Sequence, residues 1–165
     1  MPAMLIDRLH FAAKFPSAAL AGAKLTAARK PGFEAIFDAW DGVDHFDTLE
    51  WLAYMLATAW HETGTTMLPV REGFKKTDAQ AYAHVTAYCA KQGIANYAAR
   101  HSNGNSYYGR GYVQLTHANN YQKMSSRLKM GSKLYDKPDT VMEPGAAAMI
   151  LAVGLIDGMF RRSEE

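Results

Sequence analysis

The segment His61-Glu62-Thr63-Gly64 places an acidic side chain at the end of a long apolar stretch of sequence. Apolar surroundings disfavour the charged form of a carboxyl group, which raises its pKa and keeps it protonated near neutral pH. A protonated carboxyl group can serve as a general acid, for example toward a glycosidic oxygen. The plainer interpretation is a solvated glutamate at a helix end, since most glutamates are exposed. Glu62 is therefore the first candidate catalytic residue.

His61-Glu62 also begins like the zinc-binding pattern His-Glu-x-x-His, but the position of the second histidine is occupied by Thr65. The six histidines, at positions 10, 45, 61, 84, 101 and 117, show no other spacing typical of metal ligands. The sequence therefore predicts no zinc site.

A glycosidase needs a second carboxylate, and Glu72 lies ten residues beyond Glu62, in a loop after the expected helix. Such a loop can fold back across a cleft, and a gap of roughly 6.5–9.5 Å between the two carboxyl groups would admit an attacking water and predict inversion. The alternative is that Glu72 pairs with Arg71 or a nearby lysine. Asp78 is a second candidate, although it could equally cap the helix that is expected to begin near Ala79.

The run from Tyr107 to Thr116 combines aromatic, amide and hydroxyl side chains with two glycines. After a turn at Asn103-Gly104, its alternation predicts a short strand of a hairpin. A sugar ring has an apolar face and a rim of hydroxyl groups, which such side chains can bind; an ordinary hairpin with exposed tyrosines is the alternative. The face expected to bind carries Arg110, Tyr112, Gln114 and Thr116, opposite Val113 and Leu115, and Asn119, Asn120 and Tyr121 follow on the next helix.

The elements that must hold these side chains are mainly helical. The clearest helix starts at Asp47, which forms a capping box with Glu50, and ends at Gly64. We expect further helices at 17–29, at 33–40 after the break at Pro31-Gly32, at 77–99 with an interruption at Gly93, at 118–129, and from between Pro138 and Pro144 to about Phe160. The sum is a mainly α domain with one small β-hairpin.

The bulk composition fits one globular domain of 165 residues, in which the single cysteine, Cys89, is expected to be a buried hydrophobe. A net charge of +2 suits an anionic surface such as a bacterial cell wall but is too small to indicate nucleic-acid binding. The N-terminus lacks the pattern of a classical signal peptide. The longest apolar stretch, Gly145 to Ile156, is too short to span a bilayer, so we expect no stable membrane insertion.

Two motifs in this order, His61-Glu62-Thr63-Gly64 and Tyr107-Tyr108-Gly109-Arg110-Gly111-x-x-Gln114-Leu115-Thr116-x-x-x-Asn120-Tyr121, resemble glycoside hydrolase family 19. The likeness covers roughly residues 45–160 and is closest to the phage endolysin and bacterial branch. It implies a lysozyme-like, two-lobed fold, no cofactor, and hydrolysis in a single displacement.

The resemblance also implies roles for individual residues. Glu62 takes the place of the general acid, Glu72 that of the base, and Thr116 that of the hydroxyl group that helps to hold the attacking water. Arg110 is expected to support the surroundings of the acid. The residues expected to contact substrate are His61, Tyr108, Arg110, Gln114, Asn120 and Tyr121.

One departure concerns the end of the chain, which stops shortly after Phe160, where the family continues with a further helical segment. We therefore expect one lysozyme-like catalytic domain over 1–165 without the C-terminal part of the family domain. The last helix would then expose apolar surface and favour dimerisation or instability.

Three functions remain open on the sequence alone. The first is an endolysin-like enzyme that cleaves β-1,4 bonds of peptidoglycan, made in the bacterial cytoplasm and acting on the cell wall after release. The second is a chitinase that acts on N-acetylglucosamine polymers. The third is a truncated, non-catalytic protein that binds glycan strands.

Overall fold

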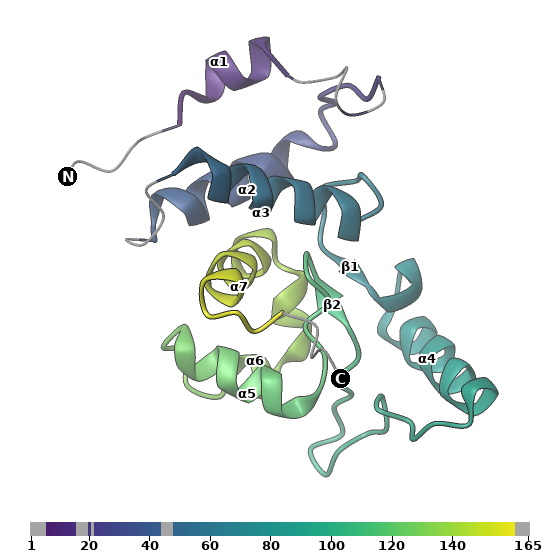
Figure 1. Cartoon of the computed structure of the whole chain (residues 1–165). Helices are drawn as coiled ribbons and strands as arrows, with labels where there is room; N and C mark the ends of the chain where they lie inside the picture. The colour runs from purple at the N-terminus through teal and green to yellow at the C-terminus, as the bar shows by residue number, and fades with distance from the viewer. Residues whose placement is uncertain (1–5, 16–19, 21, 44–47, 161–165) are drawn as a thin grey trace.

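The computed structural model describes residues 6–15, 20, 22–43 and 48–160 of the chain, and over these it is mainly helical (Figure 1). The elements run in the order α1 (Arg8–Ala13), α2 (Lys30–Asp41), α3 (Leu49–Glu62), β1 (Val70–Arg71), the 3-10 helix η1 (Glu72–Phe74), α4 (Asp78–Gln92), β2 (Arg110–Gly111), α5 (Ala118–Arg127), α6 (Lys133–Asp136), the 3-10 helix η2 (Pro138–Met142) and α7 (Pro144–Ile156).

Helix α7 lies at the centre of the main body, between the α2–α3 pair and the α5–α6 pair (Figure 1). It is apolar nearly all round, and most of its residues from Ala147 to Gly154 are buried, because it packs on one side with α2 and α3 and on the other with α5 and η2. Among the described residues, the last helix therefore lacks the exposed apolar surface that the sequence predicted, and the dimer stays a prediction.

Helix α4 and the loop after it form a smaller part with its own apolar cluster. Ala81, Val85 and Cys89 from α4 pack with Ala98 and with Tyr108. The burial of Cys89 agrees with the prediction of a small buried hydrophobe. Figure 1 shows this part beside the main body, with the two short strands between them, which gives a two-lobed arrangement.

The β-structure differs from the predicted hairpin. Strands β1 and β2 are antiparallel, with Val70 opposite Gly111 and Arg71 opposite Arg110, so the pair joins segments that are separated by the whole of α4. The expected turn at Asn103-Gly104 exists, since the Gly104 amide donates to the His101 carbonyl at 2.8 Å. No strand pair of the described residues flanks that turn.

The predicted alternation along the second strand is also wrong. After β2 the chain reverses, with the Leu115 amide donating to the Arg110 carbonyl at 2.9 Å. Gly111 at φ 92° and Gln114 at φ 52° make this tight loop, so side-chain directions do not alternate. Tyr112 and Leu115 are consequently both buried, in different parts of the core.

Several helix boundaries differ from the predictions. The described residues between 20 and 29 contain turns and no helix, so the helix expected at 17–29 is not found in them. Pro31 lies inside the first turn of α2, where its fixed φ and missing N–H are tolerated. Asp47 lies outside the described residues, and the residue before α3 is Thr48. The helices at α5 and α7 are confirmed, and Gly93, in the left-handed conformation at φ 65°, ends α4.

The first helix, α1, is attached to α2 by charge and by aromatic contact. Arg8 forms ion pairs of 2.7–2.9 Å with Glu34, Asp38 and Asp41. The centre of the Phe11 ring lies 5.0 Å from that of Phe37, and the two rings meet edge to face.

Among the described residues, no helix is both long enough and apolar enough to cross a membrane.

The entry into α2 depends on close contact with the segment after α3. A Cβ atom on Gly32 would lie 1.6 Å from the backbone oxygen of Met67, which cannot move without shifting the chain. We therefore expect Gly32→Ala to lower the free energy of unfolding by about 1–3 kcal/mol or more in urea titrations. Gly145→Ala is the matched control, because its Cβ would meet no atom within 4 Å and should leave stability unchanged or slightly raised. Equal stabilities of the two variants would contradict this packing.

Candidate active site

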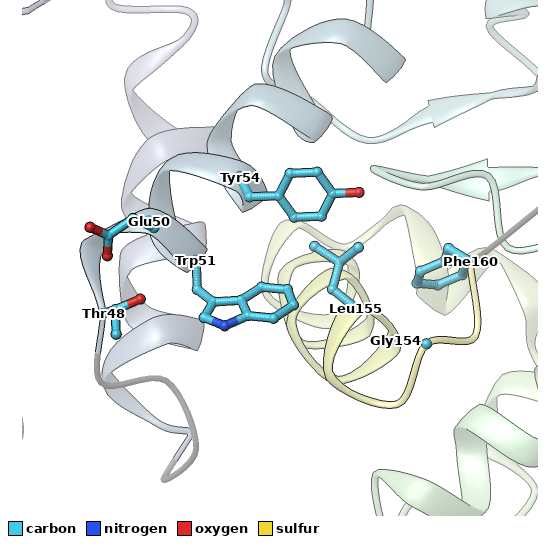
Figure 2. A pocket seen from close by; sticks show the side chains of 8 residues that line it. Thr48, Glu50, Trp51, Tyr54, Gly154, Leu155 and Phe160 are labelled. Atoms are coloured by element: carbon cyan, nitrogen blue, oxygen red, sulfur yellow. The ribbon is translucent and has the colours of Figure 1, made fainter.

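A groove runs along the exposed face of α3 as three neighbouring pockets of about 550, 410 and 270 Å³. The first and second share Tyr54, Leu155 and Phe160, and the second and third share His61 and Glu62. In the first pocket, Trp51 and Tyr54 of α3 lie across from Leu155 and Phe160 (Figure 2). The third is completed by Val70, Arg71, Gly73, Phe74 and Gln114. Glu62 therefore lies part-way along a continuous groove.

Glu62 is the last residue of α3, and its position is fixed by the residue that follows it. Thr63 is fully buried; its hydroxyl group donates to the Ala59 carbonyl at 2.7 Å and accepts from the Met67 amide at 3.0 Å. This ends the helix and leaves Glu62 pointing into the groove. The side chain is exposed, so the strongly apolar surroundings predicted for it from the sequence are not found in the free protein.

Glu72 is half-buried, and both of its carboxylate oxygens are held. Oε1 accepts a hydrogen bond from the Tyr97 hydroxyl group, and Oε2 accepts from the Gly109 amide at 2.8 Å. The Glu72 amide in turn donates to the Gly109 carbonyl at 2.8 Å. The alternative that Glu72 pairs with Arg71 is wrong, because Arg71 pairs with Asp139 at 2.8 Å.

Gln114 and Thr116 lie beside Gly109, the residue whose amide binds Glu72. A Cβ atom on Gly109 would lie 2.7 Å from Gln114 Oε1 and 3.2 Å from Thr116 Oγ1, so a side chain there would displace the Gln114 amide group. The Thr116 hydroxyl group donates to the Gln114 carbonyl at 2.7 Å, and the Asn120 side chain donates to the Thr116 carbonyl at 2.8 Å. Gln114 and both chain neighbours of Glu72, Arg71 and Gly73, line the third pocket together with Glu62.

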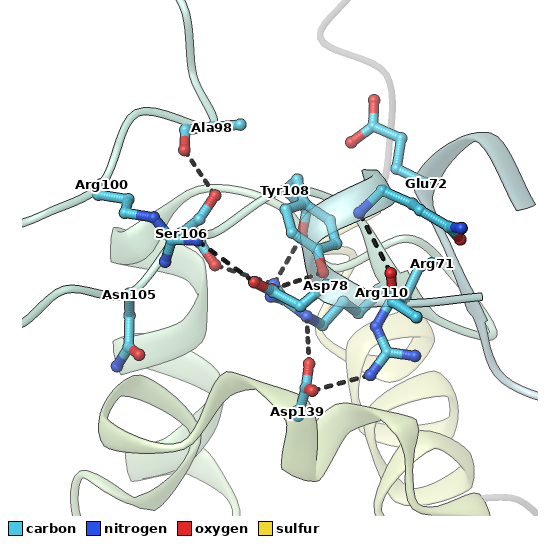
Figure 3. Close-up of polar contacts among 12 residues, drawn as sticks. Arg71, Glu72, Asp78, Ala98, Arg100, Asn105, Ser106, Tyr108, Arg110 and Asp139 are labelled. Carbon is cyan, nitrogen blue, oxygen red and sulfur yellow. Dashed lines mark hydrogen bonds and ion pairs between the residues drawn. The ribbon is translucent and has the colours of Figure 1, made fainter. Parts of the chain in front are cut away.

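Arg110 is the centre of a buried polar cluster behind this site (Figure 3). Its guanidinium group is only 1% exposed and forms ion pairs of 2.9 Å with Asp78 of α4 and with Asp139 of η2. It also donates to the Ser106 carbonyl at 2.9 Å and lies 3.7 Å from the centre of the Tyr108 ring. Asp139 binds Arg71 as well, so the two arginines of the strand pair share one carboxylate.

Three of the residues that the sequence predicted to contact substrate lie in this cluster instead. Tyr108, Arg110 and Tyr121 are all fully buried and bonded to one another: the Tyr121 hydroxyl group accepts from Arg110 at 3.1 Å and donates to the Tyr108 carbonyl at 3.0 Å. Burial raises the pKa of the Tyr121 hydroxyl group to about 12 against the opposing effect of Arg110, so it stays protonated as a donor. None of the three side chains is exposed in the free protein, and their contact with substrate stays a prediction.

Asp78 also belongs to this cluster. Its carboxylate accepts from the Tyr108 hydroxyl group at 2.8 Å and from Arg110 at 2.9 Å, and Arg100 lies 3.5 Å away. Burial alone would raise the pKa of Asp78, but the hydrogen bond from Tyr108 and the charges of the two arginines together lower it. Asp78 therefore has a structural role, which leaves Glu72 as the candidate base.

Sequence reasoning missed two residues of the site. Tyr97, which binds Glu72, comes from the loop after α4, and Asp139, which binds both arginines, comes from η2. Neither residue stands in a motif, and only the folding of distant segments brings them to the site.

In the part of the chain that the structure describes, no cluster of three or more His, Cys, Asp and Glu side chains is placed to hold a metal ion.

The fold and the family follow from comparison with known proteins. The solved structure of a bacterial family 19 chitinase, described as differing from plant enzymes, superposes with a TM-score of 0.50 at 24% identity, over 91% of this chain and 66% of that chain. Residues 26–155 match the sequence model of glycoside hydrolase family 19, described as chitinase class I, so the chain belongs to this family. No curated protein matches the chain in sequence.

The ion pairs of Asp78 predict a defined loss of stability in acid. Because its folded-state pKa lies below the ordinary value of 3.8, its contribution is present above that pH and is lost as the pH falls through the folded-state value. The side chain is 38% exposed, so we expect a modest effect, on the order of 1 kcal/mol. Urea unfolding should show Asp78→Asn less stable than wild type at pH 7, with the difference shrinking by pH 3. A difference that is the same at both pH values would contradict the assignment.

Proposed function

We propose that this protein hydrolyses β-1,4 bonds in glycans that contain N-acetylglucosamine, with Glu62 as general acid and Glu72 as general base. The observation that supports the proposal is the groove: Glu62 lines it directly, and so do Arg71 and Gly73, the two chain neighbours of Glu72. The membership in family 19 supports the same chemistry.

In this mechanism Glu62 protonates the glycosidic oxygen while Glu72 takes a proton from a water that attacks the anomeric carbon from the other face. Glu62 is exposed in the free protein, but a glycan in the groove would displace the water around it and favour its protonated form. The Thr116 hydroxyl group, which lies beside Gly109, would help to orient the attacking water. A single displacement of this kind inverts the anomeric configuration.

Substrate would be bound by the polar side chains that stay accessible and by the aromatic side chains along the groove. His61 is exposed and lines two of the pockets, and Gln114 lines the third. Asn120, half-buried beside Thr116, would act at the edge of the site. The exposed rings of Trp51, Tyr54 and Phe74 offer flat apolar faces of the kind on which sugar rings stack.

Two sources of such a glycan are to be separated by experiment. The family description, chitinase class I, supports chitin. The net charge of +2 supports an anionic cell wall, and hence an endolysin-like role in which the protein acts on peptidoglycan. The bond chemistry required of Glu62 and Glu72 is the same in both.

Removal of either carboxylate should abolish turnover while leaving the fold intact. We expect Glu62→Gln and Glu72→Gln each to lower kcat by about 10²–10⁴-fold, because each removes a proton transfer from the transition state. Glu143→Gln, which alters an exposed carboxylate before α7, is the matched control and should retain activity. Activity is measured as release from chitin oligomers and as turbidity loss of permeabilised bacterial cells, which also identifies the substrate.

Two results would count against the proposal. Unchanged activity of Glu62→Gln would remove Glu62 as the acid. A wild-type protein that binds glycan strands and releases no products would instead be a non-catalytic glycan-binding protein.

A further inference from the structure

We propose that Tyr97 is a positioning residue for the general base: its hydroxyl group holds the Glu72 carboxylate in place. This inference rests on the proposed function for its effect on catalysis. The hydrogen bond itself links residues that are 25 positions apart, on two segments that no motif connects.

The loop that carries Tyr97 is fixed on both sides of it. Gly93 ends α4 in the left-handed conformation, and the Ile94 amide donates back to the Cys89 carbonyl at 3.1 Å. The Asn96 side chain accepts from the Ala98 amide at 3.0 Å and donates to Thr86 of α4 at 3.1 Å. These bonds leave the Tyr97 ring little freedom to move away from Glu72.

The ring and the hydroxyl group of Tyr97 have separate contacts. The half-buried ring packs against the apolar cluster of α4 and lies 5.6 Å from the His117 ring, edge to face. The hydroxyl group donates to Glu72 Oε1. Removal of the hydroxyl group alone would therefore keep the packing and lose the bond to the carboxylate.

The two donors to Glu72 act on different oxygens, Tyr97 on Oε1 and the Gly109 amide on Oε2. Each oxygen keeps a second lone pair, which can accept from the attacking water. Burial raises the pKa of the Tyr97 hydroxyl group, and its bond to Glu72 raises it further, so it remains a donor throughout the neutral range. Hydrogen bonds to a carboxylate favour its ionised form, which is the form a general base needs.

Other charged or titratable side chains near the Glu72–Tyr97 pair belong to neighbouring elements, and they stay in place when the Tyr97 hydroxyl group is removed. They are Glu62 of α3, Arg71 of β1, Asp78, His84, Tyr88 and Cys89 of α4, Arg110 of β2, His117 before α5, Tyr121 of α5 and Asp139 of η2. A change in the titration of Glu72 in Tyr97→Phe is therefore due to the lost donor.

The test is the titration of Glu72 in wild type and in Tyr97→Phe, followed by ¹³C NMR of carboxyl-labelled glutamate, with the Glu72 signal assigned through Glu72→Gln. We expect the titration midpoint of Glu72 to be higher in Tyr97→Phe than in wild type, because one hydrogen bond to the ionised carboxylate is lost. The matched control is Tyr88→Phe, which removes the exposed hydroxyl group of another tyrosine near this site and should leave the midpoint unchanged. An unchanged midpoint in Tyr97→Phe, with the fold intact by circular dichroism, would overturn the inference.

Kinetics on chitin oligomers connect the titration to catalysis. The acidic limb of the kcat/KM profile should move to higher pH by the same amount in Tyr97→Phe, because the base must be deprotonated. KM should stay constant, since Tyr97 is not among the residues that line the groove pockets. If the Glu72 midpoint shifts in Tyr97→Phe but the wild-type protein has no glycosidase activity, the proposed function is overturned, whereas the hydrogen bond between Tyr97 and Glu72 is supported. A rise in KM with an unmoved acidic limb would contradict the positioning role.

Discussion

The buried guanidinium group of Arg110 must be paired with opposite charges and hydrogen-bond acceptors, and these come from several separate segments of the chain. A charge that is 1% exposed is costly unless opposite charges and acceptors surround it. The partners come from parts of the chain that are far apart: Asp78 begins α4, Asp139 lies in η2, and the Ser106 carbonyl precedes β2. Pairing Arg110 therefore attaches the smaller part, built on α4, to the main body built on α7.

The candidate site is built directly on this attachment. Gly109, the residue before Arg110, uses its amide to bind Glu72 and its missing side chain to admit Gln114 and Thr116. Arg71, the residue before Glu72, shares Asp139 with Arg110 and thereby fixes the strand pair. The second carboxylate is thus held by the same backbone segments that satisfy the buried charge, while Glu62 is placed independently by the end of α3 and the buried Thr63.

Local sequence patterns predicted the parts of the structure that depend on local rules. The apolar periodicity of α3, the break at Gly93 and the apolar run of α7 are all found, and the end of α3 places Glu62 in the groove. The segment around Arg110 was misjudged, because alternation assumes an extended strand, whereas the chain reverses after Gly111. Tyr108 in this segment and Tyr121 on the next helix were expected at the surface as sugar-binding residues. Both are buried instead, because they pack and form hydrogen bonds around Arg110. Tyr97 could not be predicted, because nothing in its neighbourhood points to Glu72.

The central claim is that Glu62 and Glu72 act from opposite faces of one glycosidic bond, with a water between Glu72 and the sugar. The most direct test is the anomeric configuration of the first product released from a β-1,4-linked N-acetylglucosamine oligomer, followed by ¹H NMR before mutarotation. The account predicts the α-anomer, because a single displacement inverts the β-linkage. Initial release of the β-anomer would show retention and would contradict the roles assigned to the two carboxylates.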